Sequence, residues 1–189
     1  VVSLCMDHKG RLWVGTYQGG LNRFENGRFK RYMPKAGDPS SLADSRVWQI
    51  IEDTEKRLWV GTLGGGLDLY DERIDGFIHH RAGDYNSIDS EFVLSMEVDS
   101  EGDLWVGTSG GLNLLEHATG RFRHFANIPE VDGSISHSHV LSIKEDAHGR
   151  LWVGTRNGLN LLNRESGKFK VFGLADGLPD HNIISMQPD

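Results

Sequence analysis

The sequence predicts an all-β protein built from repeated four-stranded sheets, and two observations support this prediction. The first is an internal repeat of about 46 residues, whose copies begin at Val1, Val47, Val93, Val140 and Ile183. The second is that each repeat reads as short apolar segments bounded by Gly, Asp or Ser, without the apolar spacing of a helix. Four short strands repeated at this period are typical of the blades of a β-propeller.

The first strand of each repeat is followed by a tight turn. The strand is apolar at its second and fourth positions and carries a small or polar residue between them, as in VVSLCM and VLSIKE. An innermost propeller strand is crowded, so a Ser fits at this position where a large side chain would not. In the turn Asp-x-x-Gly, Asp bonds its own backbone and Gly supplies a positive φ. Lys56 replaces this glycine in the second repeat, so we expect mild strain there.

The second strand reads LWVGT in all four complete repeats. Its Trp and Gly point to one face of the sheet and its Leu, Val and Thr to the other. Because propeller blades pack face to face, we expect the tryptophans to wedge between neighbouring blades and the Gly to leave room for a neighbouring side chain. These tryptophans are Trp13, Trp59, Trp105 and Trp152. The third strand begins GLN or GLD, and the fourth is centred on Phe29, Phe77, Phe122 and Phe169.

The repeat boundaries predict a single partial β-propeller over residues 1–189. Its blades are residues 1–46, 47–92, 93–139 and 140–182, and residues 183–189 supply the first strand of a fifth. A ring of about seven such blades needs roughly 320 residues, so we expect the chain to be part of a larger propeller. It opens on Val1 and stops within a repeat, so we also expect a segment of a longer protein.

Composition excludes several classes of function. The formal net charge is −7, from 20 Lys and Arg against 27 Asp and Glu, and no basic cluster occurs, which argues against nucleic-acid binding. The sequence has no apolar run of about 18 residues that could span a membrane. The single cysteine, Cys5, cannot form an intrachain disulfide.

The sequence offers no catalytic or metal-binding set. The turn aspartates Asp7, Asp53, Asp99 and Asp146 are similar to those of the Asp-box turns of sialidase-like propellers, but their presence in every repeat indicates a requirement of the fold. His137, His139 and His148 could suggest a metal site, yet no Cys or clustered carboxylate completes a ligand set. We therefore predict no catalytic residue, no metal and no cofactor in this segment.

Function is expected where the repeats differ from one another. Variation concentrates in the turn between the second and third strands and in the long connection between blades, and both lie at the same end of an up-and-down blade. Loops on a rigid scaffold are the usual place for recognition. The predicted ligand-binding residues on this loop face are Tyr17, Arg46, Phe92, His139, Arg156 and Asn182.

The unit V-x-x-I-x-x-D-x-x-G-x-LWVGT-x-x-GLN resembles the two-component regulator propeller repeat over essentially the whole chain. The resemblance implies a non-catalytic, ligand-binding sensor propeller in the periplasmic part of an inner-membrane receptor. Such receptors couple binding to a histidine kinase, or to a diguanylate cyclase, elsewhere in the parent chain. The expected partners are an extracytoplasmic small molecule or oligosaccharide and the neighbouring propeller or receptor domains, with a receptor dimer left open.

Two other functions stay open at this point. A carbohydrate-active propeller enzyme, a lyase or a hydrolase, would need carboxylates or histidines converging in the central channel, whereas the first strands offer mostly Ser and apolar residues. A scaffold for protein assembly would be favoured by a flat, apolar face at the channel mouth. The sequences that flank the segment in its parent gene would discriminate among the three.

Overall fold

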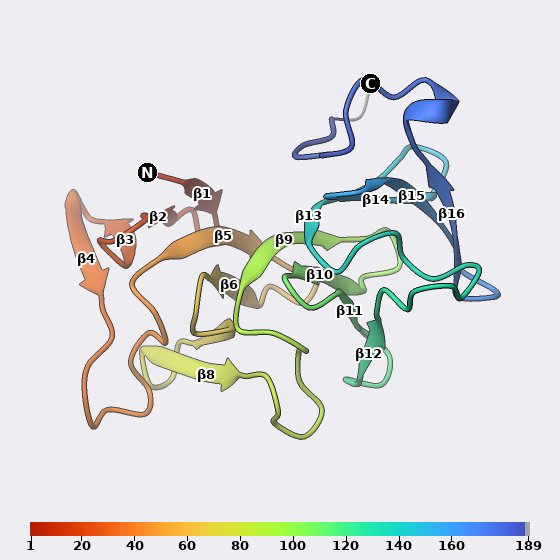
Figure 1. Ribbon diagram of the computed structural model, residues 1–189. Helices are drawn as coiled ribbons and strands as arrows, with labels where there is room; N and C mark the ends of the chain where they lie inside the picture. Colours follow the sequence, from red (N-terminus) through yellow and green to blue (C-terminus); the bar gives the residue numbers. More distant parts are fainter. Residues whose placement is uncertain (188–189) are drawn as a thin grey trace. The chain divides into compact units, whose positions relative to one another are not determined.

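The computed structural model describes residues 1–187, and within them the chain forms four antiparallel sheets of four strands each (Figure 1). The first blade consists of β1 (Ser3–Met6), β2 (Leu12–Gly15), β3 (Leu21–Glu25) and β4 (Arg28–Tyr32). The second consists of β5 (Val47–Glu52), β6 (Leu58–Thr62), β7 (Leu67–Asp71) and β8 (Gly76–His80). The third consists of β9 (Val93–Val98), β10 (Leu104–Thr108), β11 (Leu112–Leu115) and β12 (Phe122–Phe125). The fourth consists of β13 (Val140–Glu145), β14 (Leu151–Thr155), β15 (Gly158–Asn163) and β16 (Lys168–Phe172).

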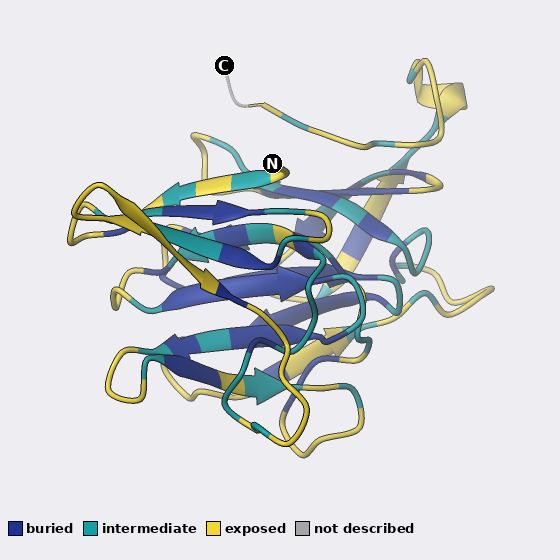
Figure 2. Cartoon of the chain, turned by 90° about the vertical axis from the view of Figure 1, so that its left-hand side faces the viewer, coloured by how far each residue is buried: buried dark blue, intermediate teal, exposed yellow. Residues whose placement is uncertain are grey.

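This architecture confirms the predicted all-β propeller fold. In every blade the strands lie in the sheet in the order in which they follow along the chain, as an up-and-down meander requires. Buried residues are most frequent in the second strand of each blade, whereas many of the loops are exposed or intermediate (Figure 2). The chain forms two compact units, which we call unit one (residues 1–93) and unit two (residues 94 onward).

The turn aspartate of each blade holds the turn and the neighbouring tryptophan together. In the first blade, Asp7 Oδ1 accepts hydrogen bonds from the backbone N–H groups of Lys9 and Arg11, and Asp7 Oδ2 accepts one from the Trp13 indole at 2.8 Å. The same indole–carboxylate bond recurs in the other three blades at 2.7–2.8 Å. This bond lowers the pKa of Asp146 in the fourth blade. The recurring aspartates are therefore structural, as their repetition indicates.

Within each unit, the tryptophan of the first blade packs against the second blade as predicted, Trp13 in unit one and Trp105 in unit two. Trp13, Trp59 and Trp105 are at most 2% exposed, whereas Trp152 is partly exposed. In unit one the Trp13 ring lies 4.8 Å from the ring of Tyr70 in the second blade. In unit two Trp105 packs in one apolar cluster with Leu151 and Leu162 of the fourth blade. The sequence did not reveal that each indole N–H also bonds the turn of its own blade.

The glycines of the LWVGT strands let the first strand of the next blade approach closely. A Cβ atom on Gly107 would lie 2.5 Å from Val140 Cγ1, and one on Gly15 would lie 2.7 Å from Val47 Cγ1. This confirms that the glycine leaves room for a neighbouring side chain. The serine of the first strand adds a polar link, since Ser95 Oγ donates to the Val140 carbonyl.

Lys56 has a φ of 66°, close to the value of 73° at the equivalent Gly10, so the predicted backbone strain is present. A left-handed conformation costs a non-glycine residue about 1–2 kcal/mol. Glycine avoids this cost, but it loses more conformational entropy on folding, which offsets part of the gain. We expect Lys56→Gly to raise the free energy of unfolding by about 0.5–1 kcal/mol. The measurement is urea unfolding, with Gly10→Lys as the reverse change, which should destabilise. Equal stability of Lys56→Gly and the wild type would contradict the strain.

The C-terminal segment differs from the expected strand. Residues 183–187 carry the sequence of a fifth first strand, but they form no strand, and residues 188–189 of the predicted segment lie outside the described residues. The Ile183 N–H nevertheless donates to the Thr155 carbonyl, as the Val47 N–H donates to the Thr16 carbonyl at the start of the second blade. The segment therefore enters where a first strand would begin. A short 3-10 turn, η1 (Leu174–Asp176), also interrupts the otherwise helix-free pattern.

A polar cluster fills the space between the first and second blades of unit one. Asp75, in the turn between β7 and β8, accepts hydrogen bonds from the hydroxyls of Tyr32 at 2.7 Å and Tyr70 at 2.6 Å. Arg23 donates to the Tyr70 hydroxyl at 2.8 Å, and Lys30 also pairs with Asp75. We call Arg23, Tyr32, Tyr70 and Asp75 the Asp75 cluster. It joins β3 and β4 of one blade to the outer hairpin of the next.

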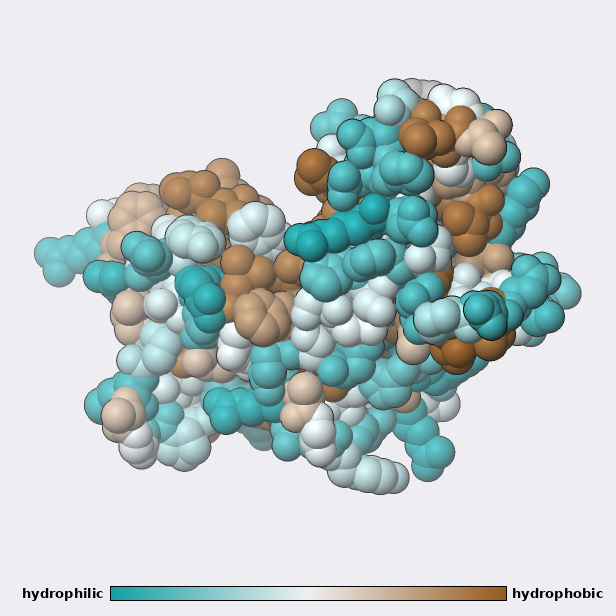
Figure 3. Space-filling model, in the orientation of Figure 1, coloured by the Kyte–Doolittle hydropathy of each residue, from teal (hydrophilic) through white to brown (hydrophobic). Residues whose placement is uncertain are grey.

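The outward face of β1 is apolar and uncovered. Leu4 and Met6 are each 61% exposed, and hydrophobic atoms gather over β1 in Figure 3. The residue equivalent to Leu4 is Ile50 in the second blade and Ile143 in the fourth, and these are only 5% and 6% exposed. Both are buried because the preceding blade packs on them, through Trp13 and Trp105 respectively. The face of β1 therefore has the character of a blade interface.

Candidate functional site

The long connections between blades end against the turn between the second and third strands of the preceding blade. In unit one the Gly20 N–H donates to the Ser45 carbonyl, and the Gly64 N–H donates to the Glu91 carbonyl, both at 3.0 Å. In unit two the Gly158 N–H donates to the His181 carbonyl at 2.7 Å. The threonine that ends LWVGT closes each turn, as Thr62 Oγ1 does by donating to the Gly66 carbonyl. The two variable regions of each repeat are thus neighbours in the folded blade.

Three of the predicted loop-face residues lie in unit one. Tyr17 and Phe92 are 53% and 46% exposed. Arg46 forms an ion pair with Asp44 at 2.7 Å, and this pair raises the pKa of Arg46, with a smaller electrostatic contribution from Tyr17. Leu63 links Arg46 and Phe92, because its N–H donates to the Arg46 carbonyl and it forms a β-bridge with Phe92. The backbone therefore brings the three residues to one edge of unit one.

The other three predicted residues lie in unit two. His137 Nδ1 accepts a hydrogen bond from the His139 N–H, and the two rings lie 5.2 Å apart. Burial lowers the pKa of His139, and nearby Arg156 and His137 lower it further. Arg156 and Asn182 are both exposed. They are close in the fold, because the neighbours of Asn182, His181 and Ile183, form backbone hydrogen bonds with Gly158 and Thr155 on either side of Arg156.

The loop face also contains unsatisfied polar atoms that sequence reasoning missed. Among the described residues, Glu91 Oε2, Ser87 Oγ and His139 Nδ1 are buried without a hydrogen-bond partner. Glu91 lies next to Phe92, and its carbonyl accepts hydrogen bonds from the Gly64 and Gly66 N–H groups. Only the position of Glu91 in a variable connection could have drawn attention to it.

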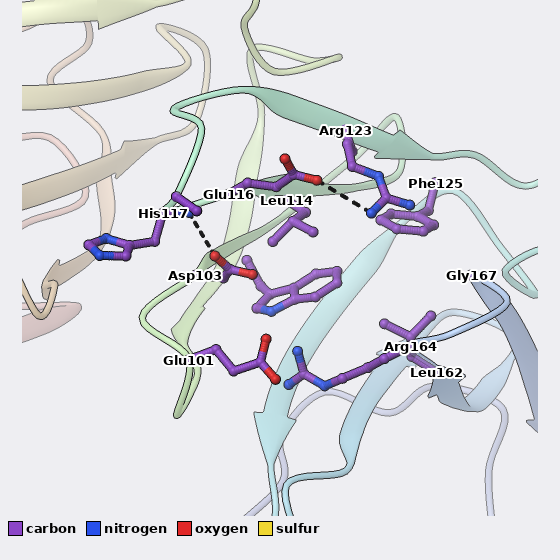
Figure 4. A pocket seen from close by; sticks show the side chains of 12 residues that line it. Glu101, Asp103, Leu114, Glu116, His117, Arg123, Phe125, Leu162, Arg164 and Gly167 are labelled. Atoms are coloured by element: carbon purple, nitrogen blue, oxygen red, sulfur yellow. Dashed lines mark hydrogen bonds and ion pairs between the residues drawn. The ribbon is translucent and has the colours of Figure 1, made fainter.

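A pocket of about 330 Å³ lies at the opposite ends of the strands in unit two, between the third and fourth blades (Figure 4). Its floor is apolar, formed by Trp105, Leu114, Leu162 and Phe125, and its rim is charged. Arg164 donates to Asp99 Oδ2 at 2.8 Å and to Glu145 Oε1 at 2.9 Å, and its guanidinium lies 5.8 Å from the Trp105 ring centre. The remaining lining residues are Glu101, Asp103, Glu116, His117, Ala118, Arg123 and Gly167.

The pocket coincides with a departure from the repeat that sequence reasoning passed over. The residue four positions after the turn aspartate is Arg11, Arg57 or Arg150 in three blades, and each stacks on its tryptophan and bonds the aspartate at 2.6 Å. In the third blade this residue is Asp103, which accepts a hydrogen bond from the His117 N–H at 2.7 Å instead. The change from Arg to Asp is visible in the sequence, but the recurring turn by itself predicts only a structural element.

The described residues contain no helix long and apolar enough to cross a membrane. Over the same residues, no three His, Cys, Asp or Glu side chains are grouped so that they could hold a metal ion.

The chain matches the family model of the two component regulator propeller at residues 1–18, 41–64, 87–110 and 134–157. No curated protein matches it in sequence. Among solved structures, it is similar to the extracellular domain of a protein described as a hybrid two component system from B. thetaiotaomicron. That similarity has 25% identity and a TM-score of 0.79, over 91% of this chain and 24% of the other.

The chain is also similar to two further solved structures. The extracellular domain of a second B. thetaiotaomicron protein, described as a one component system, is 27% identical with a TM-score of 0.69, over 90% of this chain and 25% of that one. Virginiamycin B lyase from Staphylococcus aureus is 13% identical with a TM-score of 0.66, over 91% of this chain and 55% of the lyase, which shows a shared fold alone. The chain spans about a quarter of the length of the two extracellular domains it matches.

Proposed function

The chain belongs to the two-component regulator propeller repeat family, and we propose that it is a non-catalytic sensor segment of the extracytoplasmic propeller of a bacterial signalling receptor. The observation that carries this proposal is the combination of four matched repeats with similarity to extracellular domains of two-component proteins. Binding in this segment would act on a histidine kinase or another output domain elsewhere in the parent protein. That location corresponds to the periplasmic side of an inner-membrane receptor.

The exposed face of β1 supports a propeller larger than these four blades. Leu4 occupies a position that a preceding blade covers in the second and fourth blades. Burying apolar surface stabilises by roughly 25 cal/mol per Å², so an uncovered blade interface favours association with another blade. The size of the related extracellular domains is consistent with such a ring.

The loop-face residues of each unit, taken separately, have the chemistry to bind a small polar molecule such as an oligosaccharide. Exposed aromatic rings at Tyr17 and Phe92 offer apolar surfaces on which a sugar ring can stack. Arg46, Arg156 and Asn182 supply hydrogen-bond donors, and His139 Nδ1 is buried without a partner among the described residues. Binding would signal by favouring one arrangement of the receptor over another, which requires a difference in affinity between the two.

The test uses the full-length natural protein in its own host. Two triple alanine variants divide the loop face by unit, one at Tyr17, Arg46 and Phe92 and the other at His139, Arg156 and Asn182. The measurement is the transcriptional response to a panel of oligosaccharides, together with receptor abundance. We expect at least one variant to abolish the response while its abundance stays at the wild-type level.

The matched control is a triple alanine variant at the exposed turn residues Arg73, His148 and Glu165, at the other ends of the strands. It should respond as the wild type does. If both loop-face variants also respond normally, the loop face does not bind the ligand. If the control variant alone loses the response, the sensing surface lies at the opposite ends of the strands.

A further inference from the structure

The pocket of unit two occupies the same place as the Asp75 cluster of unit one. Sheet register establishes this equivalence, because Leu114 pairs with Trp105 as Arg23 pairs with Trp13. Phe125 pairs with Leu112 as Tyr32 pairs with Leu21. Leu162 pairs with Phe169 as Tyr70 pairs with Phe77. Gly167, five residues after Leu162, stands where Asp75 follows Tyr70.

All four members of the Asp75 cluster are therefore replaced in unit two. Arg23, Tyr32, Tyr70 and Asp75 become Leu114, Phe125, Leu162 and Gly167. Each replacement removes a polar group, and three of the four also shorten the side chain. A Cβ atom on Gly167 would lie 3.7 Å from the Phe125 ring, so the missing carboxylate would have projected beside that ring. All four of the replacing residues line the cavity of about 330 Å³.

The charges around this space are reversed between the two units. In unit one, Lys9 and Arg11 of the first blade pair with Glu72 of the second, at 2.5 and 2.7 Å. The equivalent residues in unit two are Glu101 and Asp103 on the third blade and Arg164 on the fourth. Arg164 directs its two Nη atoms to Asp99 and Glu145, two carboxylates outside the pocket lining, and Glu101 of the lining adds a smaller electrostatic contribution.

The charge balance of the pocket favours a cation. Glu101, Asp103 and Glu116 line it with carboxylates. Of its two arginines, Arg164 is bound to Asp99 and Glu145, and Arg123 lies 3.4 Å from Glu116 and against the Phe125 ring. The aromatic and aliphatic floor adds apolar contact, and a volume near 300 Å³ lies at the lower end of the range for small-molecule sites.

We propose that this pocket binds a small organic cation, an amine or guanidinium carried on an aromatic body. In unit one, Tyr70 places a phenol ring against Trp13, and Arg11 places a positive charge beside it. The ligand would supply both groups to Trp105 in unit two. Its cationic group would pair with Asp103 and Glu101, and its ring would lie on Trp105 and Phe125. The site is separate from the loop face and does not depend on the proposed receptor function.

The test is calorimetric titration of the 189-residue chain with three probes that share one ring. Tyramine carries an ammonium group, p-cresol is neutral, and 4-hydroxyphenylacetate carries a carboxylate. We expect tyramine to bind about tenfold or more tightly than p-cresol, and the carboxylate to bind most weakly, because a charge-assisted hydrogen bond contributes about 1.5–3 kcal/mol. Equal binding of the three, preference for the anion, or no tyramine binding at millimolar concentration would overturn the proposal.

Variants assign the binding to the pocket. Asp103→Asn should weaken tyramine binding about tenfold while the melting temperature stays near that of the wild type. Glu165→Gln, an exposed acid next to Arg164, is the matched control and should bind tyramine as the wild type does. Should Asp103→Asn fail to fold, Glu101→Gln replaces it with the same expectation. Wild-type affinity in the folded pocket variant would show that tyramine binds elsewhere and would refute the site.

Discussion

Replacing Trp13 with alanine is expected to lower the free energy of unfolding of unit one by about 3–5 kcal/mol, the usual cost of removing a buried tryptophan. Trp13 is fully buried, and its ring contacts Tyr32 of its own blade and Tyr70 across the blade interface. Its indole also donates to Asp7 Oδ2 at 2.8 Å, so truncation leaves that carboxylate without one of its donors. Urea unfolding followed by circular dichroism measures the loss.

Trp152→Ala is the matched control, since this tryptophan has the same sequence context and the same bond to its turn aspartate but is partly exposed. Its loss should be clearly smaller than that of Trp13. Trp13→Phe separates the two contributions, because the ring is largely kept and the bond to Asp7 is removed. Equal costs for Trp13→Ala and Trp152→Ala would show that burial between blades does not determine stability.

Asp75→Ala is expected to destabilise unit one by about 2–4 kcal/mol, since two tyrosine hydroxyls lose a charged acceptor at a cost of about 1–3 kcal/mol each, reduced by partial exposure to water. Asp75 side-chain exposure is 36%, so water can replace part of what the carboxylate supplies. The matched control is Asp71→Ala at the end of β7, just before that turn, because its partner Arg73 is 86% exposed. A surface pair of this kind contributes at most about 1 kcal/mol.

The same carboxylate predicts a pH dependence. Burial alone would raise the pKa of Asp75, but hydrogen bonds from Lys30, Tyr32 and Tyr70 lower it to about 2. Its ordinary value in an unfolded chain is about 3.9, so the stabilisation is present above that pH and is lost as the pH falls toward 2. Between pH 5 and pH 2 the wild type should therefore lose more stability than Asp75→Asn. Parallel curves for the two proteins would contradict this assignment.

The repeated residues made the fold predictable from the sequence. The four LWVGT strands, the Asp-x-x-Gly turns and the Ser of the first strand recur at one period, and their sizes alone indicate blades with tightly packed inner strands. The strain at Lys56 followed from the same comparison. The hydrogen bond from each indole to its turn aspartate could not be predicted from that comparison, because it depends on the path of the turn rather than on the residue pattern.

The pocket could not be predicted in the same way. The replacement of Arg by Asp103 is visible in the sequence, but its consequence depends on Arg164 reaching Asp99 from the next blade. The loss of the Asp75 cluster is spread over four positions in two repeats, and only the sheet registers show that these positions meet. The loop-face residues stay a prediction, since their role depends on a ligand.

The most direct test of the view that function lies where the repeats differ is to convert the pocket of unit two into the Asp75 cluster. The variant combines Leu114→Arg, Phe125→Tyr, Leu162→Tyr and Gly167→Asp, and tyramine binding is measured beside the wild type by calorimetry. A folded variant that no longer binds tyramine is the predicted result. A folded variant that binds tyramine as tightly as the wild type would contradict it.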